Sequence, residues 1–126
     1  MERVSEDIEV RVESSEADST VKVIAISGNL EARSISGINQ VVLPLIEDGN
    51  VRLVFDCRQL HYVTSPALGI LINYYKKTHS QGGDTKFFGL ADNILEIFRI
   101  VGLTKTFDIH ESEEAAVGAF GAASAE

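Results

Sequence analysis

Over residues 8–14 the apolar residues Ile8, Val10 and Val12 alternate with charged residues. This period of two is typical of a strand that has one exposed face. A second strand is predicted over 20–27, where β-branched residues are frequent. The polar stretch 14–19 between the two strands predicts a hairpin turn.

Further along the chain the apolar period changes to that of helices. Helices are predicted from about Ser34, over 66–80, from Asp92 or Asn93, and from Ser112. The apolar stripes of the first three are, in chain order, Ile35, Ile38, Val42 and Leu45; Leu68, Leu71, Ile72 and Tyr75; and Ile94, Leu95, Phe98 and Val101.

A compact apolar run over 51–57 predicts a strand covered on both faces, and two further short strands are predicted over 85–89 and 107–109. The order β-β-α-β-α-β-α-β-α then predicts an α/β fold with four helices. Its sheet is mostly parallel, preceded by a strand that pairs antiparallel. We expect a single domain with its core over 8–120 and a small, polar, flexible tail over 121–126.

The most informative local feature is Ser65, which lies where a buried strand gives way to a helix. Serine as the N-cap residue, followed by Pro66 at the first helical position, predicts a helix start. A helix start presents unpaired N–H groups and a partial positive charge, which would also stabilise a phosphate. Two interpretations follow: a cap worth about 1 kcal/mol, or a site of modification or contact.

Composition narrows the class of protein. The chain has 126 residues and a formal net charge of −8, with 19 acidic residues against 11 Lys and Arg. This balance argues against direct nucleic-acid binding, which needs a basic surface. The single cysteine, Cys57, excludes an intrachain disulfide and is expected to be an inert core thiol. Without a signal peptide or a membrane-spanning stretch, we expect a cytoplasmic protein with no membrane insertion.

Catalytic patterns are weak in this sequence. Val63 and Ala67 occupy the glycine places of a G-x-S-x-G motif, and the histidines lack metal-ligand spacing. Gly82-Gly83 fits a helix end rather than a phosphate-binding loop. Asp56 is expected to orient the chain that follows it by hydrogen bonding. We therefore expect no enzyme activity and no cofactor.

The exposed face of the helix over 66–80 is predicted to present Ala67, Ile70, Asn73, Tyr74 and Lys77. Gly69 would let another chain approach closely. Ile70 and Tyr74 are four residues apart, so they form a small docking patch or lie beneath a neighbouring helix.

Five segments in chain order resemble those of the STAS domain family, the anti-sigma factor antagonists, and the resemblance covers nearly the whole chain. They are Gly28-Asn29-Leu30-Glu31, Val54-Phe55-Asp56-Cys57, Gln81-Gly82-Gly83, Ile100-Val101-Gly102-Leu103-Thr104-Lys105-Thr106-Phe107 and Ser112-Glu113-Glu114-Ala115-Ala116.

The resemblance implies a function for Ser65. The family signature is an aspartate, a phosphorylatable serine or threonine, a small residue and a glycine; here these places hold Thr64, Ser65, Pro66 and Ala67. The unphosphorylated protein would bind an anti-sigma factor with serine kinase activity. The kinase would then phosphorylate Ser65 and break the complex, and a serine phosphatase would reset it. The expected partner-binding residues are Thr64, Ser65, Pro66, Ala67, Gly69, Ile70 and Tyr74.

Two other functions remain open. One is an accessory STAS subunit of a membrane transporter, which is also a docking module. The other is a small enzyme or nucleotide-binding protein that uses the loop at the strand end, although no acid–base pair or phosphate-binding loop supports it.

Overall fold

The computed structural model describes residues 2–5 and 8–121 of the chain. Within these residues the strands form a six-stranded sheet in the order β1-β2-β3-β4-β5-β6. β1 pairs antiparallel with β2 and β2 with β3, and all later pairs are parallel. The strands are β1 (Glu2–Ser5), β2 (Ile8–Ser14), β3 (Lys22–Leu30), β4 (Arg52–Val63), β5 (Asp84–Phe88) and β6 (Asp108–His110).

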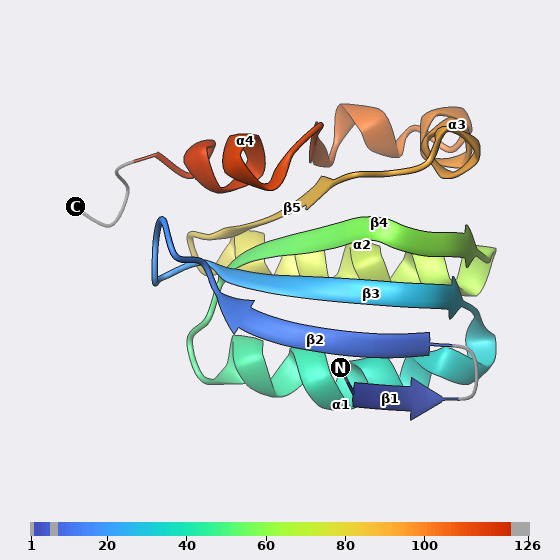
Figure 1. Ribbon diagram of the computed structural model, residues 1–126, viewed down its shortest axis with the longest axis horizontal. Helices are drawn as coiled ribbons and strands as arrows, with labels where there is room; N and C mark the ends of the chain where they lie inside the picture. Colours follow the sequence, from blue (N-terminus) through green and yellow to red (C-terminus); the bar gives the residue numbers. More distant parts are fainter. Residues whose placement is uncertain (1, 6–7, 122–126) are drawn as a thin grey trace.

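The helices cover the two faces of the sheet unequally. α1 and α2 lie behind the sheet in Figure 1, and apolar side chains of α1, α2 and α3 share one large core with the sheet. α4 packs on the opposite face over a smaller cluster that includes Val54 and Phe88. The helices are α1 (Ile35–Glu47), α2 (Ser65–Ser80), α3 (Asp92–Ile100) and α4 (Glu113–Gly118), with short 3₁₀ turns η1 (Ala32–Ser34) and η2 (Leu103–Lys105).

The predicted α/β fold, with its mostly parallel sheet and four helices, is confirmed. The structure adds one strand, β1, that the sequence pattern did not predict. Four residues are too few to show a period, and β1 is held by backbone pairing with β2. Val101, assigned to the apolar stripe of the third helix, is 54% exposed and lies beyond the end of α3. Apart from Gly121, the predicted tail lies outside the described residues.

β4 is longer than the strand predicted over 51–57, and this difference positions the start of α2. β5 pairs with β4 only as far as Asp56, whereas β3 pairs with β4 up to Val63. The register between β3 and β4 shifts twice along this extension. Such bulges break the alternation of apolar and polar positions, which hid the strand from the sequence pattern.

α2 ends where the glycine pair predicted. Gly82 adopts a positive φ of 86°, and the N–H of Gly83 donates to the carbonyl of Thr78 at 2.8 Å. A Cβ on Gly83 would lie 1.8 Å from the carbonyl oxygen of Val51. Glycine is therefore required at position 83 because β4 begins directly against it.

Candidate functional site

The chain passes from sheet to helix at Thr64. Its N–H donates to the carbonyl of Leu30 in β3 at 3.1 Å, and its own carbonyl accepts from the N–H of Leu68 at 2.9 Å. Thr64 has an extended backbone and occupies the N-cap position, so Ser65 is the first residue of α2. The prediction of Ser65 as the N-cap is therefore wrong by one residue: the last hydrogen bond to β3 ends at Thr64, and the helix turns immediately after it.

The hydroxyl of Ser65 does not cap the helix. No side-chain cap bond is present at the start of α2, and Ser65 is exposed. Pro66, Gly69 and Asn73 are exposed along the same helix, and we call these four residues the α2 ridge. A Cβ added at Gly69 would meet no atom within 4 Å, so the surface above this glycine is open to another chain.

Two residues predicted on the exposed face of α2 are buried. Ala67 and Tyr74 are both 0% exposed, and Ile70 is half-buried against the core. The phenol of Tyr74 donates a hydrogen bond to Asn39 of α1. The prediction that Tyr74 belongs to an exposed docking patch is therefore wrong. The alternative prediction, that Tyr74 lies beneath a neighbouring helix, is confirmed. α2 buries a wider arc than its apolar stripe indicated because α1 packs beside it.

A second hydroxyl lies next to Ser65. The Oγ1 atom of Thr64 is buried and has no hydrogen-bond partner among the described residues. A buried hydroxyl without a partner costs free energy. The Thr64 hydroxyl is therefore an unused hydrogen-bonding group in the residue that precedes Ser65.

The electrostatic surroundings of Ser65 favour a negative group. The first turn of α2 holds no acidic residue, and the N–H groups of Ser65 and Ala67 belong to the unpaired donors of a helix start, whereas Pro66 has none. η1 contacts α2 and carries Arg33, whose side chain is 62% exposed and lies 3.8 Å from Glu31. No sequence pattern indicates Arg33, because its place near α2 depends on the contact between η1 and α2 in the folded chain.

Asp56 and Cys57 are structural residues of β4. Cys57 is buried, and burial raises the pKa of its thiol, as expected for an inert core cysteine. The Asp56 carboxylate accepts from the backbone N–H of Arg58 at 3.1 Å and from its guanidinium at 3.0 and 2.8 Å. Burial raises the pKa of Asp56, but the hydrogen bonds from Arg58 outweigh this effect and lower it. Asp56 thus orients the following residues, as predicted.

The described residues offer no metal site. His61 and His79 are exposed, and His110 lies 2.9 Å from Asp108. No group of three His, Cys, Asp or Glu side chains in the described ranges could hold a metal ion. In the same ranges, no helix is both long enough and apolar enough to cross a membrane.

Solved structures of several different proteins have a similar fold. An anti-sigma factor antagonist from Mycobacterium paratuberculosis has a TM-score of 0.79 at 23% identity, over 89% of this chain and 92% of its own. The phosphorylated form of the Bacillus cell fate determinant SpoIIAA has a TM-score of 0.69 at 17% identity, over 89% and 99%. A sulfate transporter family protein from Wolinella succinogenes has a TM-score of 0.70 at 12% identity, over 84% of this chain and 92% of its own. At these identities the likeness shows the fold alone.

Sequence comparison identifies the family. The anti-sigma-B factor antagonist of Bacillus subtilis is 29% identical over 112 residues, which cover 88% of this chain and 98% of that protein. The model of the STAS domain matches residues 11–116, which include β3 to β6 and the start of α2. This protein therefore belongs to the STAS domain family.

Proposed function

We propose that this protein is an anti-sigma factor antagonist that binds an anti-sigma factor through the α2 ridge. Ser65 is the switch: the anti-sigma factor, acting as a serine kinase, phosphorylates it, and a serine phosphatase restores the free hydroxyl. The protein itself has no catalytic role in this proposal. Because the kinase uses ATP, the proposal includes a cytoplasmic location.

The observation that carries the proposal is the exposure of Ser65 at the start of α2. Its hydroxyl is free of any capping bond, so a kinase could reach it and a phosphate could be added without displacing a structural contact. A phosphoserine carries a charge of about −1.5 to −2 at neutral pH. The helix start tolerates this charge in the free protein, so the fold is kept in both states.

The same charge would weaken a complex that covers the ridge. In the unphosphorylated protein the ridge presents small and neutral groups, and Gly69 leaves room for close approach. A phosphate on Ser65 would add bulk and a charge that is costly to desolvate within an interface. The relative in Bacillus subtilis, named an anti-sigma-B factor antagonist, supports the same class of partner.

Thr64 and Pro66 are the two neighbours of Ser65 that depart from the family signature. Thr64 contributes no negative charge beside the acceptor, and its buried Oγ1 lacks a partner. Pro66 removes one N–H from the helix start. A phosphate on Ser65 would therefore rely on the remaining N–H groups of the helix start rather than on a full set of backbone donors.

Phosphorylation is tested by incubating the protein with ATP and each anti-sigma factor kinase of the source organism. Mass spectrometry then locates any phosphate. We expect phosphate on Ser65 of the wild type and none on the Ser65→Ala variant. A complex that forms without any phosphate on Ser65 would remove the switch and leave only docking.

A pull-down discriminates the alternatives. Recovery of an anti-sigma factor supports the proposal, whereas recovery of transporter subunits without a kinase would favour the accessory role. The structural likeness to the transporter family protein shows the fold alone, so that role stays a second prediction. Turnover or tight nucleotide binding by the isolated protein would instead favour the enzyme alternative.

A further inference from the structure

The face of the sheet opposite α1 and α2 is only partly covered. α4 packs over Val54 and Phe88 near one end of this face, and no helix lies in front of β2 and β3 in Figure 1. Arg11 and Glu13 of β2 are exposed there.

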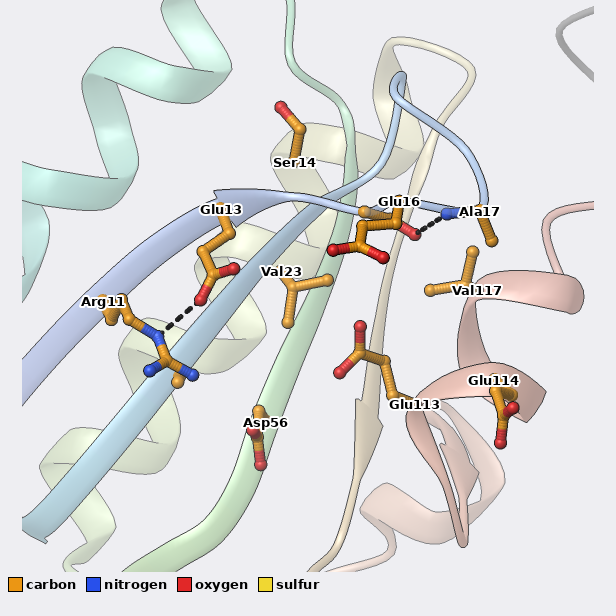
Figure 2. Close-up of a pocket in the computed structure, with 12 residues that line it drawn as sticks. Arg11, Glu13, Ser14, Glu16, Ala17, Val23, Asp56, Glu113, Glu114 and Val117 are labelled. Carbon is orange, nitrogen blue, oxygen red and sulfur yellow. Dashed lines mark hydrogen bonds and ion pairs between the residues drawn. The ribbon is translucent and has the colours of Figure 1, made fainter.

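A cavity of about 280 Å³ lies in this uncovered region, between the β2–β3 hairpin and α4 (Figure 2). Its apolar lining comes from Val23 and Ala25 of β3 and Val117 of α4. Its acidic lining comes from β2, the hairpin, β4 and α4: Glu13, Glu16, Asp56, Glu113 and Glu114.

The charge of this lining is not balanced. Arg11, the one basic residue of the lining, is 2.7 Å from Glu13, and Asp56 is paired with Arg58. Glu16 and Glu114 form no ion pair within the described part of the chain, and Glu113 interacts electrostatically with Arg58 without forming an ion pair. In Figure 2 the carboxylates of Glu16 and Glu113 point toward the same space beside Val23.

Helix stabilisation explains only part of this arrangement. Glu113 and Glu114 lie in the first turn of α4, where acidic residues stabilise a helix. Glu16 belongs to the hairpin and to no helix, so that effect does not account for its position at the cavity. The hairpin and α4 thus present acidic groups to one apolar hollow from two sides.

We propose that this cavity is a second protein-docking site, which accepts an arginine side chain from a basic segment of a partner protein. A guanidinium is planar and offers several donors, so it can engage Glu16 and Glu113 together. The methylene stem of arginine would pack on Val23 and Val117. The net charge of −8 makes the protein as a whole attract a basic partner.

The cavity is separate from the α2 ridge. It opens on the face of the sheet opposite α2, and β4 runs from Asp56 to Val63 before Ser65 is reached. At the usual rise of a strand this segment spans on the order of 25 Å. Both sites could therefore be occupied at once, and failure of either proposal leaves the other standing.

The test is an amide NMR titration of the whole protein with the peptide acetyl-Gly-Ala-Arg-Ala-Gly-amide. The control peptide replaces arginine with citrulline, which has the same shape without the charge. We expect saturable shifts at the amides of Val23, Ala25 and Glu113, and none with the citrulline peptide. The double variant Glu16→Gln/Glu113→Gln should weaken binding on the order of tenfold.

A matched variant, Glu47→Gln/Asp48→Asn, removes two exposed charges at the end of α1, and it should bind as the wild type does. The proposal is overturned if the citrulline peptide binds equally, if the double variant keeps its affinity, or if the shifts fall at Ser65 and Gly69. Spermidine that shifts the same amides with equal affinity would also overturn it, in favour of a small polyamine.

Discussion

The phenol of Tyr74 in α2 donates a hydrogen bond to the side-chain oxygen of Asn39 in α1. Tyr74 is fully buried, its ring stacks on that of Phe55 with the centroids 6.0 Å apart, and burial raises the pKa of its hydroxyl. This contact joins the helix that carries Ser65 to its neighbour. It fixes which face of α2 is turned outward.

Removal of the Tyr74 hydroxyl is expected to destabilise the protein. Tyr74→Phe keeps the ring but leaves Asn39 without its donor, so the free energy of unfolding should fall by about 1–2 kcal/mol. Tyr62→Phe is the control because Tyr62 is 51% exposed, and its effect should stay within about 0.5 kcal/mol. Urea unfolding of both variants provides the measurement. Equal effects would contradict a structural role for the contact.

Two glycines are expected to respond in opposite directions to substitution by alanine. Gly83→Ala places a Cβ against the carbonyl of Val51, so unfolding should become easier by about 2–3 kcal/mol. Gly69→Ala adds a Cβ in open space within α2 and should stabilise by roughly 0.5–1 kcal/mol. Thermal unfolding measures both. Stabilisation by Gly83→Ala would show that the close approach of Val51 is wrong.

The sequence predicted the layers of the fold well because its strands and helices have distinct apolar periods. The strand over 8–14 and the helix start at Ser112 are observed at those positions, and Ser112 Oγ accepts from the N–H of Ala115 at 3.1 Å. The strand predicted over 51–57 is shorter than β4 because the two bulges of β4 interrupt the alternation of apolar and polar residues that reveals a strand.

The candidate site was predicted less completely. Ser65 was predicted to be the N-cap residue from the proline that follows it, but Thr64 occupies that position and Ser65 is the exposed first residue of α2. Burial of Ala67 and Tyr74 depends on how α1 lies against α2, which no local pattern contains. The acidic cavity combines residues of β2, the hairpin, β4 and α4, so only the folded chain could reveal it.

Asp56 is expected to make stability depend on acid pH. Because hydrogen bonds from Arg58 lower the pKa of Asp56 in the folded protein despite its burial, the carboxylate stabilises the fold above its unfolded pKa of about 3.9. This contribution is lost as pH falls through the lower, folded pKa. Asp56→Asn should cost about 1–3 kcal/mol at pH 7 and should flatten the acid limb of the stability curve.

The partner of Asp56 provides a sharper version of this test. Arg58→Gln leaves the Asp56 carboxylate buried without its guanidinium, so its pKa should rise, as NMR titration of the carboxyl group would show. Asp48→Asn, which removes an exposed carboxylate, should leave stability within about 0.5 kcal/mol. An unchanged pKa of Asp56 in Arg58→Gln would contradict the assigned cause.

The switch at Ser65 is tested most directly by the affinity of the anti-sigma factor for three proteins, measured by calorimetry. They are the wild type, Ser65→Asp and the control Ser80→Asp, which makes the same substitution at the exposed far end of α2. We predict that Ser65→Asp weakens binding more than about 100-fold, or roughly 3 kcal/mol, while Ser80→Asp binds as the wild type does. Equal affinity of all three proteins would contradict the account.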